Sequence, residues 1–302
     1  MAALGKCIHE WMTNYKQKSV KPATYDRLET SYKLMSQYYI SREDIETLTT
    51  DKIQRYINHL AEDGYSLSTI KKQYHLISAF VSYANANGII FRPIHKGVNL
   101  PVRSSIRSES KTVMAYSQYE QEKLYSVLKT LEKPSYAAAI LMMETGMRIG
   151  EVLALEWSDI DWSRRAVRIS KTVVRLGNHK KEYVQNEPKS YSSIRTVPLS
   201  LKAYDLLFEL REPSGYVIHD AYGDILSYEA VRWQITQACR KAGVEYYGQH
   251  IFRHTFATNC YNRGCDVKIL SKLLGHADVA VTYNTYIHLF GDALEEMRKV
   301  VG

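Results

Sequence analysis

Cysteine is scarce in this chain of 302 residues, and the few cysteines form no recognisable metal-binding pattern. The four are Cys7, Cys239, Cys260 and Cys265, and no CxxC pair occurs among them. Cys260 and Cys265 lie close to His254 in the sequence, but their spacing matches no standard zinc site. We therefore expect reduced, partly buried thiols and no bound metal.

Long apolar runs are also missing. No stretch of about 18 apolar residues occurs, which argues against a membrane span. Residues 1–6 lack the apolar core of a signal peptide, so a cytoplasmic protein is expected. The sequence has no phosphate-binding Gly-Lys-Ser/Thr loop and no obvious carboxylate cage, which disfavours nucleotide hydrolysis and metal-dependent hydrolysis.

The basic charge is concentrated in the first third of the chain. Residues 1–111 contain 16 Lys and Arg against 10 Asp and Glu, a net +6, whereas the rest contains 24 against 22, a net +2. A basic segment of this kind indicates a polyanionic partner, most commonly DNA. A basic but merely solvated surface explains the same composition, so other features must decide.

Residues 1–100 predict an all-helical domain. Apolar spacing, helix-capping residues and stop signals place helices at about 4–15, 21–39, 50–63 and 66–87. Lys71 and Lys72 come early in the fourth helix, where they are candidates for phosphate contacts. Solvated helix charges are the alternative interpretation of both lysines.

Residues 101–116 predict a polar linker that contains Arg103 and Arg107, two further candidates for contacts with DNA. From Ser117 a second, mostly helical unit is expected to reach residue 290. Residues 166–174 and 194–199 are rich in β-branched side chains and predict a small antiparallel sheet. Residues 157–163 between the first helices and this sheet predict a turn. Lys189 lies in the turn before the last strand.

The most informative residues come late in the chain. His250 and Arg253 are three residues apart, so a helix places them on one face. Arginine binds phosphate oxygens through parallel N–H donors, and histidine exchanges a proton near neutral pH. The hydroxyl of Tyr286, with an ordinary pKa of about 10, needs such neighbours to attack a phosphorus atom. The pattern predicts phosphodiester chemistry through a covalent phosphotyrosine, although a lone His-x-x-Arg pair also occurs on solvated helix faces.

Five motifs in order strengthen this prediction. They are Thr-Gly-Met-Arg-Ile-Gly-Glu from residue 145, Pro-Lys-Ser with Arg-Thr-Val-Pro-Leu, His-x-x-Arg-His-Thr-Phe-Ala-Thr from residue 250, Leu-Leu-Gly-His, and Thr-Tyr-x-His ending at residue 288. Together they resemble the tyrosine recombinase (phage integrase) family over residues 117–290. The helical residues 1–100 resemble the family's SAM-like core-binding domain, with a weaker match. The implied fold is mainly α, with a small antiparallel sheet in the catalytic domain.

The resemblance implies roles for six residues. Arg148 and Arg253 would hold the non-bridging oxygens of the scissile phosphate and offset the charge of its transition state. Lys189 would protonate the leaving 5′-hydroxyl, and His250 would accept a proton or bind phosphate on the nucleophile's side. His276 would donate a hydrogen bond to the phosphate. Tyr286 would be the nucleophile that forms a 3′-phosphotyrosine, with no cofactor.

Two neighbouring residues bear on this assignment. Tyr283 is an alternative nucleophile, but Tyr286 lies ten residues after His276 and is followed by Ile-His, as in the family. Glu151 is a candidate to orient Arg148 from the next helical turn.

The implied function is a site-specific DNA recombinase or integrase of a mobile element, acting on double-stranded DNA with inverted-repeat core sites. The alternatives are a type IB topoisomerase, which uses related chemistry, and a sequence-specific DNA-binding protein without catalysis. No arm-binding domain precedes the helical region, so a two-domain recombinase is expected. Arg232 and Arg240 on the helix predicted at 227–242 are candidates for reading bases.

Two recombining sites with two protomers each require a homotetramer on DNA, and a monomer or weak dimer is expected without DNA. An accessory protein that bends DNA or sets direction is a further candidate partner. Residues 291–302 predict a short amphipathic helix with one apolar stripe, which we expect to dock on a neighbouring protomer.

Overall fold

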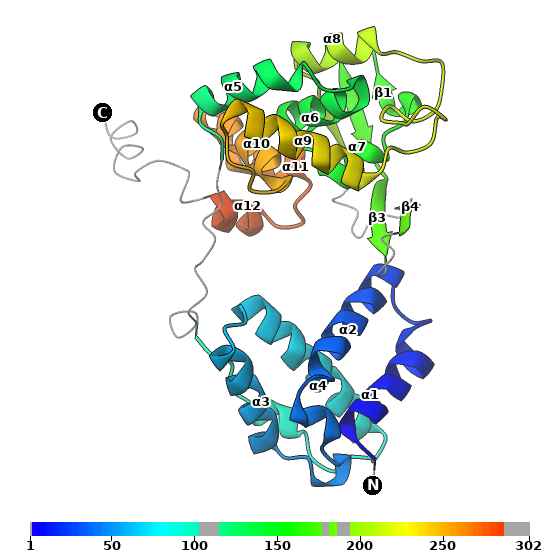
Figure 1. Ribbon diagram of the computed structural model, residues 1–302, viewed down its shortest axis with the longest axis vertical. Helices are drawn as coiled ribbons and strands as arrows, with labels where there is room; N and C mark the ends of the chain where they lie inside the picture. The colour runs from blue at the N-terminus through cyan, green and yellow to red at the C-terminus, as the bar shows by residue number, and fades with distance from the viewer. Residues whose placement is uncertain (1, 103–114, 177–180, 186–193, 287–302) are drawn as a thin grey trace, which may run out of the picture. The chain divides into compact units, whose positions relative to one another are not determined.

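The computed structural model describes residues 2–102, 115–176, 181–185 and 194–286. The chain forms two compact units, the first within residues 2–102 and the second from most of residues 115–286 (Figure 1). Arg103, Arg107, Lys189 and the segment 291–302, for which the sequence made predictions, lie outside the described residues. No helix in the described ranges is long and apolar enough to cross a membrane.

The first unit is helical, as the sequence predicts. Its main helices are α1 (Leu4–Trp11), α2 (Pro22–Met35), α3 (Thr50–Glu62) and α4 (Leu67–Ala86). A π-helical turn, Met12–Lys16, follows α1, and 3₁₀ turns occupy Tyr39–Arg42, Ile45–Thr47 and Ile94–Gly97. The side chain of Ser66 caps α4 by accepting a hydrogen bond from the backbone N–H of Thr69. The second helix ends at Met35 and not near residue 39 as predicted, because a separate 3₁₀ turn begins at Tyr39.

The apolar stripe of α3 forms part of this unit's core. Ile53, Tyr56, Ile57 and Leu60 are fully buried and pack with apolar residues from α1 and α4. The buried Tyr56 hydroxyl donates a hydrogen bond to the Gln73 side chain at 3.0 Å, so its burial leaves no unpaired donor. The apolar spacing of the α3 sequence thus gives the packed face.

The second unit contains the remaining helices and all of the described strands. Its helices are α5 (Gln118–Leu128), α6 (Lys133–Thr145), α7 (Ile149–Leu153), α8 (Leu201–Glu209), α9 (Tyr228–Ala242), α10 (His250–Asn262), α11 (Val267–Leu274) and α12 (Val279–Tyr286). Its strands are β1 (Ile160–Asp161), β2 (Ala166–Ile169), β3 (Thr172–Leu176), β4 (Lys181–Gln185) and β5 (Arg195–Pro198).

Helix α6 lies at the centre of the second unit. It packs against α7, α8, α9 and α10, and Figure 1 shows these helices around it. Residues 137–143 of α6 are all buried, because this almost wholly apolar helix has no polar face to expose. Helix α5 packs against α9 and begins with a capping box in which Ser117 and Glu120 exchange hydrogen bonds.

The predicted antiparallel sheet is confirmed. Strands β1, β2 and β5 form a three-stranded sheet in that order, with Val167 opposite both Ile160 and Val197. The prediction of a plain turn over residues 157–163 was wrong in part, because Ile160 and Asp161 pair with β2. Two residues are too few to show alternation in the sequence, and pairing with β2, which follows after residues 162–165, decides their state. Strands β3 and β4 form a separate two-stranded sheet.

Gly146 ends α6 in a conformation that only glycine adopts without strain. Its φ is +67°, in the left-handed region. A Cβ atom at this position would lie 2.4 Å from Cδ1 of Phe256, a residue of α10. The chain can therefore turn from α6 into Arg148 and α7 only because this residue has no side chain.

We predict that Gly146→Ala destabilises the second unit markedly more than Gly243→Ala. Gly243 ends α9 with φ of +65°, but no atom would lie within 4 Å of an added Cβ. Gly243→Ala should therefore cost only the left-handed strain of about 1–2 kcal/mol. Gly146→Ala should cost about 1–3 kcal/mol more through overpacking against α10. Urea unfolding of both variants measures the difference, and equal losses would show that α6 and α10 can separate freely at this point.

Candidate active site

The Arg253 side chain lies at the centre of the candidate active site. It projects from the first turn of α10 and is only 3% exposed. Its Nη1 donates to the carbonyl oxygen of Gly146 at 2.9 Å, and its Nη2 donates to the carbonyl oxygen of Leu274 at 2.5 Å. The same Nη2 lies 2.9 Å from Nε2 of His276. One guanidinium therefore joins α10 to the end of α6, the end of α11 and the segment after α11.

Burial, followed by the nearby charge of Arg148, lowers the pKa of Arg253 to about 9. The guanidinium still carries its proton at neutral pH. Two guanidinium groups near each other favour a bound anion, because their mutual repulsion falls when a negative charge lies between them. The site is therefore suited to a phosphate group.

A buried carboxylate holds Arg148 in place. Glu151 on α7 accepts hydrogen bonds from Nη1 of Arg148 at 2.9 Å and from the Arg148 backbone N–H at 2.8 Å. Arg195 on β5 also donates to both Glu151 oxygens, at 3.1 and 2.8 Å. The Nε of Arg195 donates in turn to the carbonyl oxygen of Leu273 at 2.6 Å. Glu151 and Arg195 thus form a bridge from Arg148 to the C-terminal end of α11.

The electrostatics of this bridge favour an ionised carboxylate. Burial acts to raise the pKa of Glu151, but the hydrogen bonds and charge of Arg195, followed by the charge of Arg148, lower the pKa to about 2. Glu151 is therefore negative at neutral pH and compensates part of the positive charge. Among the described contacts Glu151 accepts from Nη1 of the Arg148 side chain, which is 37% exposed, so other N–H groups of Arg148 can reach a ligand.

His276 is held by hydrogen bonds through both ring nitrogens. Its Nδ1 lies 2.7 Å from the Thr282 hydroxyl, and its Nε2 faces Arg253. Since arginine can only donate, Nε2 accepts and Nδ1 carries the proton. Burial, and then the charges of Arg253 and Arg148, lower the pKa of His276 to about 4, so the ring is neutral at pH 7. Donation to a phosphate from Nε2 requires this ring to gain a proton or rotate.

Tyr286 reaches the same point from α12. Its side chain is 1% exposed, and its hydroxyl lies 3.1 Å from Nδ1 of His254. Burial raises the pKa of Tyr286, while the charge and hydrogen bond of Arg253 offset part of this rise. Tyr283 on the same helix is 51% exposed. Of the two tyrosines weighed from the sequence, the structure brings Tyr286 to the arginines.

His250 is the first residue of α10, and its side chain reaches the surface. Its ring centroid lies 6.4 Å from that of His254, one turn further along the same face. Partial burial lowers the pKa of His250, and the charges of Arg253 and Arg148 lower it further. The ring is therefore mostly neutral at pH 7 and able to accept a proton.

The structure thus gathers Arg148, His250, Arg253, His276 and Tyr286 in one region, while Lys189 lies outside the described residues. Sequence reasoning assigned no role to three further residues of the region, which are Arg195, His254 and Thr282. Arg195 could have been noticed because it occupies an inward position in the alternating burial pattern of β5. The contacts of His254 and Thr282 depend on where α12 packs, which no local pattern shows.

The four described residues that were predicted to contact DNA are exposed. Lys71 and Lys72 are exposed in the second turn of α4. Arg232 and Arg240 are exposed on α9, and Arg232 lies 3.4 Å from Glu229. Their exposure is compatible with phosphate or base contacts and with solvated charges alike, so their role stays a prediction.

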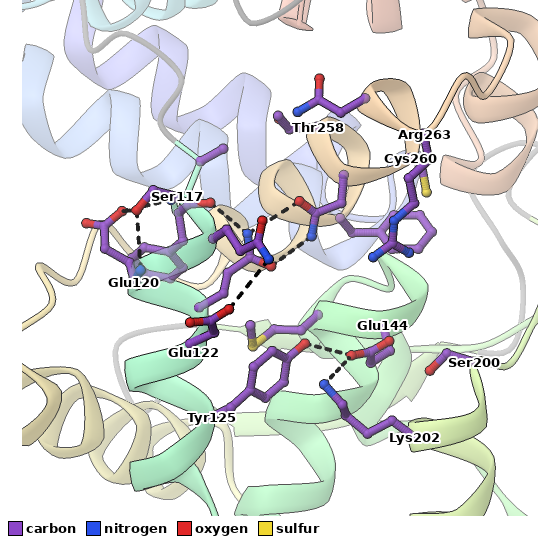
Figure 2. A pocket seen from close by; sticks show the side chains of 18 residues that line it. Ser117, Glu120, Glu122, Tyr125, Glu144, Ser200, Lys202, Thr258, Cys260 and Arg263 are labelled. Carbon is purple, nitrogen blue, oxygen red and sulfur yellow. Dashed lines mark hydrogen bonds and ion pairs between the residues drawn. The ribbon is translucent and has the colours of Figure 1, made fainter.

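A cavity of about 720 Å³ lies away from the candidate active site, among α5, α6 and the later turns of α10. Figure 2 shows its polar side chains paired with one another. The Tyr125 hydroxyl donates to Glu144 at 2.6 Å, and Lys202 lies 3.2 Å from the same carboxylate. Cys260 lines this cavity without a disulfide. None of the five predicted catalytic residues that the structure describes lines it.

In the described part of the chain, no three or more His, Cys, Asp and Glu side chains cluster so that they could hold a metal ion. The cysteines near His254 therefore form no described metal site.

We predict that the Glu151–Arg195 pair couples strongly in a double-mutant cycle. Arg195→Met leaves a buried carboxylate with a single cationic partner, which should cost about 3 kcal/mol of unfolding free energy. Arg195→Met combined with Glu151→Gln should cost less than the sum of the two single changes. The exposed pair Lys133–Glu209, 3.5 Å apart, is the control, and Lys133→Met should cost under about 1 kcal/mol. Additive losses at the buried pair would contradict the bridge.

Comparison with known proteins agrees with this geometry. The model of the phage integrase family matches residues 114–292, more than half of the chain. The model of the phage integrase SAM-like domain matches residues 4–97.

Individual relatives cover nearly the whole chain. A XerC-like tyrosine recombinase of Caldanaerobacter subterraneus subsp. tengcongensis is 29% identical, over 95% of this chain and 79% of that protein. The transposase from transposon Tn916 of Enterococcus faecalis is 23% identical, over 94% of this chain and 75% of that protein. The Tn1549 transposon integrase, solved in complex with transposon right end DNA, superposes with a TM-score of 0.82 at 18% identity, covering 100% of both chains. The chain therefore belongs to the phage integrase family, the tyrosine recombinases.

Proposed function

We propose that this protein is a site-specific DNA recombinase that integrates a mobile element, with Tyr286 as its nucleophile. The observation that carries the proposal is the convergence of Arg148, Arg253, His276 and the Tyr286 hydroxyl from separate segments of one unit. The Tn916 and Tn1549 relatives act for transposons, which favours a mobile element over the other uses of this chemistry.

The chemistry would proceed in two balanced steps. In the first, the Tyr286 oxygen forms a bond to phosphorus while the bond from phosphorus to the 5′-oxygen breaks. The phenol gives up its proton, and the leaving 5′-oxygen takes one, a role that the family resemblance gives to Lys189. In the second, a 5′-hydroxyl of another strand reverses these changes. One phosphate ester replaces another in each step, so no external energy source is needed.

The two arginines would supply most of the transition-state stabilisation. Charge builds on the non-bridging oxygens when phosphorus has five ligands, and fixed donors in a water-poor site stabilise such charge strongly. Arg253 is fixed by the carbonyl oxygens of Gly146 and Leu274. Arg148 is fixed by Glu151. Neither guanidinium needs to reorganise when the phosphate binds.

DNA is the proposed partner, and the assembly on it is a homotetramer. The Tn1549 integrase was solved with transposon DNA, and the present chain shares its fold. The exposed Lys71 and Lys72 on α4 and Arg232 and Arg240 on α9 are the described candidates for contacts. Exchange between two sites, each cut on both strands, needs four nucleophiles and hence four protomers. The inverted-repeat form of the sites and any accessory protein remain part of the same proposal.

We predict that Tyr286→Phe abolishes covalent attachment to DNA. The native protein, mixed with sheared DNA of its source cells and denatured with detergent, should yield protein-linked fragments whose sequenced ends cluster at an inverted repeat. The Phe variant lacks the attacking oxygen and should yield none, while still binding DNA. Tyr283→Phe, on the exposed face of α12, is the matched control and should keep the adducts.

Each other result selects an alternative. Adducts with Tyr286→Phe but not with Tyr283→Phe would show that Tyr283, and not Tyr286, is the nucleophile. Binding without adducts by the native protein would favour a DNA-binding protein without catalysis. Adducts with relaxation of supercoils but no strand exchange would favour a topoisomerase.

We predict that deletion of residues 291–302 abolishes pairing of two sites but not binding to one. This segment has an apolar stripe of Ala293, Leu294, Met297 and Val300, which a short helix cannot bury alone. Docking on a neighbouring protomer would cover it. Native gel shifts should lose the four-protomer complex and keep the single-site complex, and Leu294→Asp should act like the deletion. Glu296→Gln, outside the stripe, is the control, and full recombination by the deletion variant would rule out the docking.

A further inference from the structure

His254 contacts the proposed nucleophile directly. It follows Arg253 on α10, and its Nδ1 lies 3.1 Å from the Tyr286 hydroxyl. The two rings meet edge to face, with centroids 5.3 Å apart and planes at 65°. His254 is half-buried, and Tyr286 is almost fully buried. The phenol therefore has a partner in addition to Arg253.

The direction of one of these hydrogen bonds follows from the groups involved. Arg253 can only donate, so the Tyr286 oxygen accepts from it. With the ring proton of His254 on Nε2, the single O–H of the phenol donates to Nδ1. Arg253 as donor and Nδ1 of His254 as acceptor together define where the Tyr286 oxygen lies and where its proton points.

We propose that His254 is a positioning residue for Tyr286, which holds the phenol oxygen in line for attack by accepting its O–H bond at Nδ1. This inference rests on the proposed role of Tyr286 as nucleophile. Displacement at phosphorus needs the attacking atom opposite the leaving oxygen, and a misplacement of about 1 Å can cost roughly 100-fold in rate. Arg253 also contacts Gly146, Leu274 and His276, and its single hydrogen bond to the phenol leaves the phenol oxygen free to move sideways.

The placement of His254 in the fold supports a positioning role. Its backbone belongs to the helix that fixes Arg253, and Arg253 is tied to three other segments. The Thr258 hydroxyl donates to the His254 carbonyl oxygen at 3.0 Å, one turn later on the same helix. The Nδ1 acceptor is therefore fixed relative to the proposed phosphate site, whereas Tyr286 arrives on α12, which packs on α10 and α11. His254 would therefore align Tyr286 on α12 with the proposed phosphate site on α10.

Three substitutions separate positioning from a structural role. Asn carries its Oδ1 on Cγ, where His carries Nδ1, so His254→Asn keeps an acceptor at the same distance from the backbone. His254→Gln places the acceptor one bond further out. His254→Leu keeps apolar bulk without an acceptor. Helix propensity ranks Gln above Asn, so a purely structural role predicts that Gln is the better replacement.

The readout is the single-turnover rate of adduct formation at saturating DNA, on a duplex that carries the cleavage site recovered with the native protein. We expect His254→Leu to lower this rate by about 100-fold and His254→Asn to recover at least about tenfold of that loss, with His254→Gln close to Leu. The dissociation constant for DNA and the thermal midpoint should stay near the native values.

The outcomes are distinguishable from failure of the proposed function. If the native protein forms no adducts, the proposed function itself is wrong, and if Tyr286→Phe still forms them, the proposed nucleophile is wrong. If Tyr286 is essential but His254→Leu cleaves at the native rate, only the positioning role is wrong. A slow Leu variant with Gln faster than Asn, or with Asn no faster than Leu, also overturns hydrogen-bond positioning through Nδ1.

Discussion

The burial of the Arg253 charge is the constraint on which the second unit depends. A guanidinium that is 3% exposed is tolerated only if its donors are paired, and here they reach Gly146, Leu274 and His276. Those acceptors belong to the end of α6, the end of α11 and the segment after it. The same contacts that pay for burial therefore also fix where α6, α10 and α11 end relative to one another. In this unit the same contacts stabilise the packing of the helices and position the candidate active site.

The left-handed turn at Gly146 shows how closely backbone and site are linked. Its carbonyl oxygen accepts from Arg253, its missing side chain makes room for Phe256, and the chain then leads directly into Arg148. Both proposed phosphate ligands are thus set by one turn. A change in the turn would move Arg148 and would also weaken the anchoring of Arg253. This is the physical reason for a glycine at residue 146.

Much of this could be predicted from the sequence, because the signals are local. The Ser66 and Ser117 caps, the apolar stripe of α3 and the apolar α6 each follow from neighbouring residues. The motif order named the residues that the structure gathers. The contacts of Arg195 and His254 could not be predicted, because each depends on a partner far away in the sequence. Strand β1 was missed because two residues show no alternation. Local sequence patterns predict the chemistry and secondary structure of a residue, whereas tertiary packing determines which residues it contacts.

The two histidines show how a bound phosphate would act on the proton equilibria of the proposed site. His276 has a pKa of about 4, and His250 is also lowered, first through burial and then through the charges of Arg253 and Arg148. A phosphodiester at the proposed site would bring one negative charge, which offsets the second cause but not the first. That charge would act to raise the pKa of both rings. His276, an acceptor toward Arg253 in the free protein, would then be a better donor.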